Sequence, residues 1–295
     1  MFDGISVAMA TPFRDGKLDE EGIERLLAHL HEGRVDGVVP AGCTGEAATL
    51  TLAERETLVR ACVRSRRPGS FVLAGAGTNA TETTKQLVER AAEWGADGVL
   101  LITPYYNKPT QSGLLAHFRE IAKRTSLPIM LYNVPGRTGV RLEPETIARL
   151  GEVENIVAVK EACGSLDQVS ELCRTTSLSI LSGDDSLTLP MLAVGATGVV
   201  SVAGNLHPRA LGEMIRAHTA GRVDRAREIH QRLLPLFKGL FLESNPGPVK
   251  NLLARRGLIA DALRLPLVPV EPETADRLAK VAEEVERSLG ELDLS

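Results

Sequence analysis

Short apolar runs alternate with longer amphipathic stretches along most of this chain, and this alternation constrains the fold more than any other feature. Most of the amphipathic stretches begin with Asp, Thr or Ser near the first turn, as helices do at their N-caps. The predicted strands are residues 5–11, 37–41, 71–75, 98–103, 128–133, 156–160, 179–183 and 198–202. The clearest predicted helices are residues 19–32, 53–66, 81–94, 111–125 and 143–150. The chain is therefore predicted to be an α/β protein.

The predicted strands are nearly continuous apolar runs, which is typical of a parallel sheet covered by helices on both faces. Eight strands with intervening helices match a (β/α)8 (TIM) barrel, and 295 residues are enough to build one. A doubly wound open sheet is the alternative. Against it, the segment Ala-Thr-Pro-Phe-Arg-Asp-Gly after the first strand contains no Gly-x-Gly-x-x-Gly phosphate loop.

The pattern changes after about Gly221. Residues 223–242, 248–256 and 272–289 are predicted to be helices with no strand between them. We therefore expect a catalytic (β/α)8 barrel over residues 1–221 and a C-terminal helical region over residues 222–295.

Composition and charge exclude several kinds of partner. The formal net charge is −4 with no block of like charges, so we expect neither nucleic acid nor a membrane surface as a partner. No apolar run approaches the roughly 18 residues that span a bilayer, and the first residues do not form a secretory leader. The four cysteines, Cys43, Cys62, Cys163 and Cys173, have no metal-ligand spacing. We expect no metal, and a cytoplasmic location.

Lys160 closes the apolar run Ile-Val-Ala-Val, at the end of a strand where barrel enzymes carry their chemistry. Apolar surroundings favour the neutral amine, which can form a Schiff base with a carbonyl compound. The alternative is a structural ion pair between Lys160 and the adjacent Glu161. The chain's three tyrosines, Tyr105, Tyr106 and Tyr132, also fall at predicted strand ends, where a phenol can move the protons that Schiff-base chemistry requires.

Other polar residues also collect at the predicted strand ends. Residues 42–46, Gly-Cys-Thr-Gly-Glu, offer small side chains and backbone N–H groups that suit a carboxylate, or they form a plain glycine turn. Arg137 could hold a second carboxylate bidentately, or face solvent in its turn. Asp184 and Asp185 lack a third metal ligand, so helix capping is the better interpretation.

These residues lie in motifs that resemble the dihydrodipicolinate synthase and N-acetylneuraminate lyase family of Schiff-base aldolases. The resemblance runs nearly end to end and includes Asn245-Pro246 and Pro248-Val249-Lys250. Its most specific motifs are Gly-Cys-Thr-Gly-Glu (42–46), Thr-Pro-Tyr-Tyr-Asn-Lys-Pro (103–109), Tyr-Asn-Val-Pro-Gly-Arg-Thr-Gly (132–139), Val-Lys-Glu-Ala (159–162) and Leu-Ser-Gly-Asp-Asp (181–185). The family implies a (β/α)8 barrel with a C-terminal helical region, a homotetramer, and pyruvate bound as an imine on lysine without a metal or organic cofactor.

The resemblance assigns the proton-transfer residues one by one. Lys160 matches the Schiff-base lysine and Tyr132 the general acid/base. Tyr106 matches the tyrosine that a neighbouring subunit lends to the proton relay. Cys43 stands where synthases carry Thr and lyases Ser, and a thiol is a weaker hydrogen-bonding group than a hydroxyl. Because Cys43 replaces the usual Thr or Ser, the resemblance alone does not fix the identity of the second substrate.

Substrate-binding positions follow from the same resemblance. Thr44 and the adjacent backbone match the pyruvate-carboxylate site, and Gly183 and Val200 match positions lining the pyruvate pocket. Arg137 matches the arginine that, in the synthase subgroup, meets the carboxylate of aspartate 4-semialdehyde. The Gly-Arg-Thr-Gly turn favours that subgroup over the sialic-acid lyases.

The expected function is condensation of pyruvate with an aldehyde, aspartate 4-semialdehyde, to give 4-hydroxy-tetrahydrodipicolinate for lysine and diaminopimelate synthesis. One alternative is another pyruvate-dependent aldolase or dehydratase, acting on a 2-keto-3-deoxy sugar acid or 4-hydroxy-2-oxoglutarate. A more remote alternative is a non-catalytic barrel that binds a 2-oxo acid.

The resemblance also bears on feedback inhibition. Lysine-sensitive relatives present a carboxylate and a histidine to lysine in a cleft between subunits. The matching positions here are Thr83 and Leu52, although Asn79 and Tyr105 are retained. We therefore expect weak or no inhibition by lysine.

Overall fold

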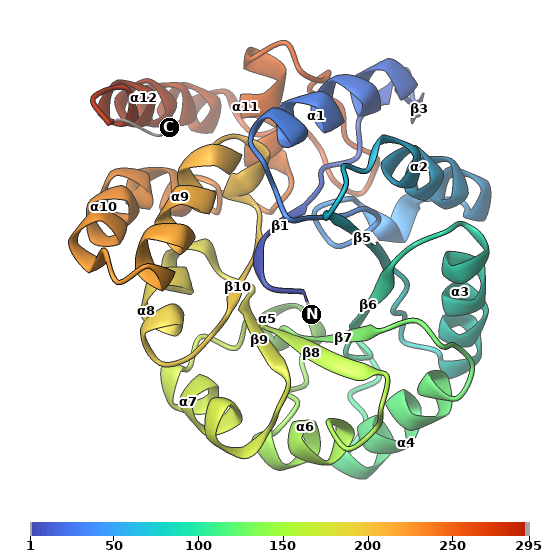
Figure 1. Cartoon of the computed structure of the whole chain (residues 1–295). Coiled ribbons are helices and arrows are strands. Elements are labelled where there is room, and N and C mark those ends of the chain that lie inside the picture. The colour runs from blue at the N-terminus through green and yellow to red at the C-terminus, as the bar shows by residue number, and fades with distance from the viewer. Residues whose placement is uncertain (1, 293–295) are drawn as a thin grey trace.

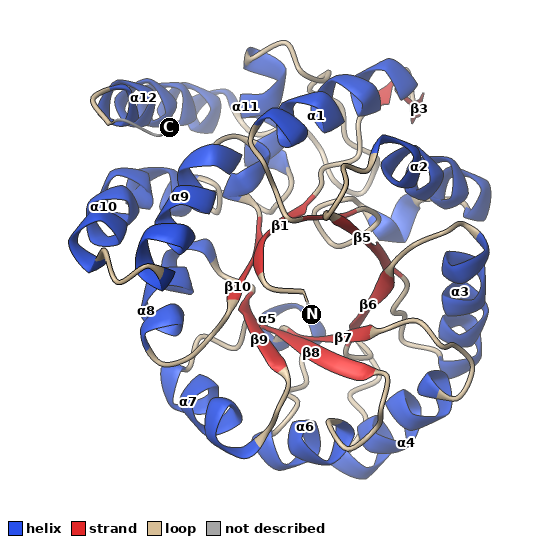
Figure 2. Cartoon of the chain, viewed as in Figure 1, coloured by secondary structure: helices blue, strands red, loops and turns tan. Residues whose placement is uncertain are grey.

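A closed parallel barrel forms the centre of the molecule (Figures 1 and 2). The computed structural model describes residues 2–292. Within them, eight strands pair in the order β1-β10-β9-β8-β7-β6-β5-β4, and β4 pairs with β1 to close the ring. The strands are β1 (Gly4–Ala8), β4 (Gly37–Val39), β5 (Phe71–Gly75), β6 (Gly98–Ile102), β7 (Ile129–Asn133), β8 (Ile156–Glu161), β9 (Ser179–Ser182) and β10 (Gly198–Ser201). The expected (β/α)8 fold is confirmed, and the open sheet is excluded.

Helices surround the strands on the outside of the ring (Figure 2). Side-chain N-caps start several of them, from Asp19, Thr51, Thr110 and Ser165, as their sequences predict. The helices of the ring are α1 (Glu20–Glu32), α2 (Leu52–Ser65), α3 (Thr81–Glu93), α4 (Gln111–Ala122), α6 (Pro144–Leu150), α7 (Leu166–Thr175), α8 (Thr188–Ala193) and α9 (Pro208–Thr219). The short α5 (Pro135–Thr138) follows β7 directly and lies within the outline of the ring in Figure 1.

Two strands end two or three residues earlier than predicted. β1 stops at Ala8 rather than at Thr11, and β4 stops at Val39 rather than at Ala41. Pro40 follows β4 directly and has no N–H to donate to a sheet, and Ala41 has a positive φ of 54°. The apolar residues beyond the strands are buried, so hydrophobicity alone overestimates strand length.

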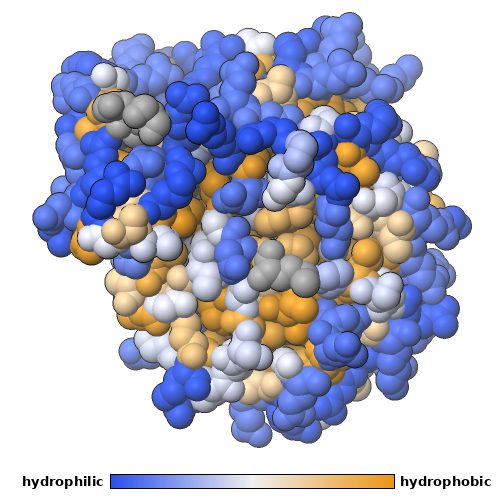
Figure 3. Space-filling model, viewed as in Figure 1, coloured by the Kyte–Doolittle hydropathy of each residue, from blue (hydrophilic) through white to orange (hydrophobic). Residues whose placement is uncertain are grey.

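Apolar side chains fill the space inside the barrel and the layer between strands and helices. The interior cluster includes Val39, Leu73, Met130, Ala158 and Val200. On the face shown in Figure 3, hydrophilic residues dominate the outer rim, whereas hydrophobic residues gather around the middle of the ring. In the described part of the chain, no helix is long and apolar enough to cross a membrane.

Three further helices follow the barrel: α10 (Val223–Gly239), α11 (Gly247–Arg255) and α12 (Pro272–Gly290). They lie at one edge of the ring, beside α9 and α1 (Figure 1). Their buried side chains join the same apolar cluster as residues of β1 and β10. The helical C-terminal extension is therefore confirmed, while the domain boundary at residue 221 stays a prediction.

Several short elements have no counterpart among the predicted ones. They are the hairpin of β2 (Phe13–Arg14) and β3 (Lys17–Leu18), and the 3-10 turns η1 (Ala47–Thr49), η2 (Asp185–Leu187) and η3 (Ala203–Asn205). Each is too short to show a repeating hydrophobic pattern. η1, η2 and η3 follow the carboxyl ends of β4, β9 and β10, and they shape the mouth of the barrel.

Candidate active site

Lys160 lies near the carboxyl end of β8 and is almost completely buried. Its strand partner in β7 is Tyr132, because the register pairs these two residues directly. The Lys160 ammonium nitrogen lies 4.2 Å from the centre of the Tyr132 ring. The structure therefore brings together the two side chains that the sequence analysis put first.

Burial favours the neutral form of the Lys160 amine. Loss of hydration lowers the pKa of Lys160 from 10.5 to about 8, and it outweighs the attraction of the nearby Asp185 carboxylate, which acts in the opposite direction. With a pKa about one unit above neutrality, roughly one lysine in ten is uncharged at pH 7. That fraction is enough to supply a neutral amine as a nucleophile.

Glu161 does not pair with Lys160. Successive residues of a strand point to opposite faces, so Glu161 faces the helices while Lys160 faces the barrel interior. The Glu161 carboxylate accepts hydrogen bonds from Asn133 Nδ2 at 3.0 Å and from Gln168 Nε2 at 3.0 Å. The alternative of a structural Lys160–Glu161 ion pair is therefore wrong.

The Tyr132 phenol meets the Cys43 thiol. Burial raises the pKa of Tyr132 well above its usual range, and a hydrogen bond with the half-buried Cys43 side chain acts in the same direction. The nearby Arg137 opposes both effects. The phenol therefore stays protonated near neutrality, in contact with a thiol and beside an amine.

Thr44 lies next to Cys43 in the loop after β4 and is buried. Its hydroxyl accepts a hydrogen bond of 3.0 Å from Asn245 Nδ2. The Asn245 carbonyl in turn accepts a bond of 3.4 Å from Arg137 Nη2. Asn245 thus connects two candidate carboxylate-binding residues. In the sequence Asn245 stands out only as part of the Asn245-Pro246 motif, because nothing local shows that a residue beyond α10 reaches the barrel mouth.

A cavity of about 380 Å³ opens beside Tyr132 and Cys43, and the buried Lys160 and Thr44 are not among its lining residues. Its lining includes Cys43, Tyr132 and Arg137, together with Asn245 and Arg55. Arg137 is exposed at the cavity and, among the described residues, forms no ion pair with a carboxylate. Its guanidinium therefore keeps donors for an acidic ligand, in a space large enough for a small molecule.

Gly183 lies beside Lys160 and Val200 lies in the barrel interior, and neither residue lines this cavity. A Cβ atom on Gly183 would stand 2.7 Å from Cβ of Ala162 and 3.0 Å from Cε of Lys160, so a larger residue here would displace one or both. Val200 is buried in the interior cluster together with Tyr132. A role of either residue in the wall of a pyruvate pocket stays a prediction.

The two aspartates after β9 have different roles. Asp184 caps η2, as interpreted from the sequence. Asp185 instead turns inward, where it accepts hydrogen bonds from Ser201 Oγ and from the Ala203 N–H at 2.8 Å. It therefore ties the ends of β9 and β10 together. In the part of the chain that the structure describes, no group of three His, Cys, Asp or Glu side chains is placed to hold a metal.

Tyr106 stands apart from the rest of the candidate site. Its side chain is 89% exposed and its φ is +75°, an uncommon conformation for a tyrosine. Tyr105 before it is 37% exposed and lines the cavity. Within one chain, the structure does not bring Tyr106 to Tyr132 or Cys43.

The fold is a closed (β/α)8 barrel, and a lysine, a tyrosine and an arginine lie at or just after the carboxyl ends of its strands. Enzymes with this fold carry their active sites at that end of the barrel, so the chain has the architecture of a (β/α)8-barrel enzyme. The model of the dihydrodipicolinate synthetase family matches residues 1–285, and the chain belongs to this family. The family expected from the motifs is thereby confirmed.

Individual relatives agree along nearly the whole chain. The 4-hydroxy-tetrahydrodipicolinate synthase of Methanothrix thermoacetophila is 49% identical over 99% of this chain and 100% of its own length. The solved structure of the synthase of the same name from Methylacidiphilum fumariolicum is 46% identical, with a TM-score of 0.96 and 98% of each chain covered. A dihydrodipicolinate synthase from Acinetobacter baumannii, solved in complex with pyruvate, is 37% identical with a TM-score of 0.95, covering 97% of this chain and 99% of its own. The chain is therefore an enzyme of the lyase class.

Proposed function

We propose that this protein condenses pyruvate with aspartate 4-semialdehyde, releasing water, to form 4-hydroxy-tetrahydrodipicolinate in the synthesis of diaminopimelate and lysine. The observation that carries the proposal is the buried Lys160 amine beside the Tyr132 ring, at the carboxyl ends of adjacent strands. Membership of a family whose relatives bear the synthase name supports the same reaction.

The chemistry follows from a neutral amine in a closed site. The Lys160 nitrogen attacks the ketone carbon of pyruvate, and the carbinolamine loses water to give an imine. Loss of a proton from the pyruvate methyl group gives an enamine, whose carbon attacks the aldehyde and forms the new carbon–carbon bond. The amine of the second substrate then displaces Lys160 by closing the ring. The lysine supplies the electron sink, so the proposed reaction needs no metal or organic cofactor.

Each of these steps needs a proton moved at a defined atom. We assign Tyr132 as the general acid/base, because its phenol stays protonated and lies against Lys160. The Cys43 thiol contacts the phenol and extends the relay. Tyr106 would complete it from a second copy of the chain, since its exposed side chain is free to enter a neighbour's site. This role supports a homotetramer, which we propose to work in the cytoplasm.

The two substrates bring carboxylates that need separate sites. We assign Thr44 and its neighbouring backbone to the carboxylate of pyruvate, with Gly183 and Val200 as the wall of the pocket. Arg137 is assigned to the carboxylate of aspartate 4-semialdehyde, because its guanidinium faces the cavity.

Borohydride trapping followed by a coupled assay tests the proposal. Reduction in the presence of pyruvate should fix a pyruvate-derived adduct on Lys160, detected by peptide mapping. Aspartate 4-semialdehyde should then be condensed faster than sugar-acid aldehydes. An adduct elsewhere, or none, contradicts the mechanism and favours a barrel that only binds a 2-oxo acid. Preference for a sugar-acid aldehyde, or cleavage of a 2-keto-3-deoxy sugar acid, favours the other aldolases of the family.

The Cys43→Thr variant is expected to raise the condensation rate. The thiol forms weaker hydrogen bonds than the hydroxyl of threonine would form with Tyr132. Because a positioned proton-transfer group contributes about 10²–10⁴-fold, even partial repair of the relay should be visible in kcat. Steady-state rates of parent and variant measure the effect, with Cys173→Ser on α7 as a thiol control. An equal or lower kcat in a folded variant would mean that Cys43 serves only packing.

Lysine is expected to inhibit the enzyme weakly or not at all. Where sensitive relatives offer a histidine and a carboxylate, this chain has Leu52, which is 49% exposed, and Thr83. The structure also places the Arg55 guanidinium near Tyr105, where it donates a hydrogen bond of 3.1 Å to the Gly75 carbonyl. A cation without a counter-charge is a poor ligand for a cleft that already holds a guanidinium. Initial rates against lysine concentration test this, and inhibition at micromolar lysine would contradict it.

A further inference from the structure

A second buried lysine lies outside the group assigned to the reaction. Lys250 on α11 is fully buried, and its nitrogen lies 2.6 Å from Oε1 of Glu46 and 2.9 Å from the Thr11 carbonyl. It also stands 4.6 Å from the centre of the Phe13 ring. Glu46 belongs to the loop of residues 42–50 after β4, which also carries Cys43. An ion pair thus joins the C-terminal region to the loop at the cavity.

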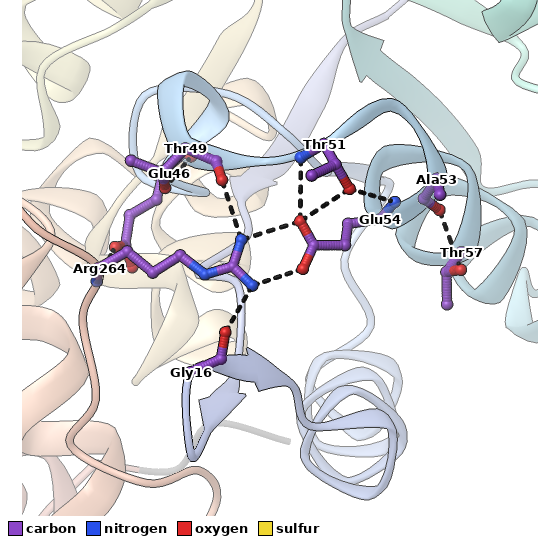
Figure 4. Close-up of polar contacts among 8 residues, drawn as sticks. All are labelled: Gly16, Glu46, Thr49, Thr51, Ala53, Glu54, Thr57 and Arg264. Carbon is purple, nitrogen blue, oxygen red and sulfur yellow. Dashed lines mark hydrogen bonds and ion pairs between the residues drawn. The ribbon is translucent and has the colours of Figure 1, made fainter.

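The other oxygen of Glu46 is held by the same region. Glu46 Oε2 accepts a hydrogen bond of 3.0 Å from the Arg264 N–H. The Arg264 guanidinium donates hydrogen bonds to both carboxylate oxygens of Glu54. It donates two more, of 2.9 Å to the Thr49 carbonyl and of 2.8 Å to the Gly16 carbonyl (Figure 4). Residues 46, 49 and 54 are thus all fixed by one segment beyond α11.

The backbone of the 42–50 loop needs such external support. Ala41 and Glu46 have φ values of 54° and 52°, in the left-handed region that side-chain-bearing residues seldom adopt. Strained residues of this kind persist only where their surroundings hold them. The Glu46 N–H donates a hydrogen bond of 3.1 Å to the Cys43 carbonyl. Thr11 Oγ1 donates a hydrogen bond of 2.7 Å to the Gly45 carbonyl. A shift at Glu46 is therefore transmitted to Cys43 and to Thr44 beside it.

We propose that Glu46, clamped between Lys250 and the Arg264 backbone, is a positioning residue that fixes the pyruvate-carboxylate site and the Cys43 thiol. This inference rests on the proposed function. Glu46 also lines the cavity, and the buried Lys250 charge offsets its carboxylate there. The clamp thus keeps a fixed negative charge from repelling an acidic substrate.

The Glu46→Asp variant separates position from charge. Aspartate keeps the negative charge and tolerates the left-handed conformation, but it shortens the reach towards Lys250 by one carbon–carbon bond, about 1.5 Å. A displacement of this size can cost about 10²-fold. We expect the pyruvate concentration that half-saturates borohydride trapping to rise about 10–10²-fold. The maximal trapping rate should fall less than this, because Lys160 and Tyr132 are not moved and only the Cys43 end of the relay shifts. Loss of folded protein alone would lower the trapped amount without raising that concentration.

The control is Glu213→Asp, which shortens another buried glutamate, paired with Arg216 and Arg222 on the outer side of α9. It should leave trapping as in the parent. Should Glu46→Asp fail to fold, Lys250→Met/Glu46→Gln removes both charges, leaves neither unpaired, and carries the same expectation.

The outcomes are distinct. If the parent traps no pyruvate, the proposed function fails. If the parent traps pyruvate, a raised half-saturating concentration in either variant, with Glu213→Asp unaffected, supports the clamp. Parent-like saturation in a folded variant overturns the positioning role. Failure of both variants to fold overturns it too, because the pair would then serve stability alone.

Discussion

Replacing Lys160 with methionine is expected to abolish borohydride trapping of pyruvate and to lower kcat/KM for condensation by at least about 10⁴-fold. Removal of a covalent nucleophile leaves only binding and proton transfer, and losses of this order or more follow in other enzymes. Methionine nearly fills the volume of the lysine stem, so the barrel should stay folded. Circular dichroism and mass analysis of the trapped protein measure both effects.

The parent protein supplies a second readout of the same residue. Because the pKa of Lys160 is lowered to about 8, the neutral amine becomes more abundant as pH rises. The rate of imine formation should therefore increase with pH up to about 8 and level off above it. Lys85→Met, which removes a lysine paired with Glu82 on α3, should keep full trapping. Trapping by Lys160→Met at the parent's rate would assign the imine to another lysine.

Arg137→Ala is expected to spare imine formation while lowering kcat/KM for aspartate 4-semialdehyde by about 10²–10⁴-fold. A bidentate contact with a carboxylate contributes roughly 1.5–3 kcal/mol per hydrogen bond, and the variant loses both bonds. Within residues 2–292, the Arg137 side chain makes one hydrogen bond, of 3.4 Å to the Asn245 carbonyl, so its removal should disturb the fold little. Borohydride trapping with pyruvate and condensation rates separate the two effects.

The matched control is Arg141→Ala, which removes an exposed arginine four residues further along that does not line the cavity. It should condense both substrates as the parent does. Normal use of aspartate 4-semialdehyde by Arg137→Ala would show that the second substrate is a different aldehyde.

Local sequence patterns predicted the barrel and pointed to Lys160. A short apolar run marks each strand in the sequence, and the polar residue that ends the run lies at the mouth of a parallel barrel. The same pattern offered three tyrosines at strand ends, and only the family resemblance singled out Tyr132. The direct pairing of Lys160 with Tyr132 between β8 and β7 adds the geometry that the sequence could not supply.

Contacts between segments that are far apart in the chain could not be predicted from the sequence. Asn245 reaches Thr44 across 201 residues, and no local periodicity reports such a meeting. The inward turn of Asp185 depends on the N–H groups that follow β10. The outward direction of Tyr106 depends on a positive φ in a tight loop. In each case tertiary structure decides the role, because short polar segments carry no repeating pattern.

The clamp on the 42–50 loop also has a consequence for the order in which the protein is made. Glu46 precedes Lys250 by 204 residues. At a synthesis rate of about 5–20 residues per second, the ribosome adds Lys250 roughly 10–40 s after Glu46. The loop's buried carboxylate has no cation to meet during this interval, even after β7 and β8 have been made. The carboxylate site can therefore be completed only when α11 and the segment after it have emerged.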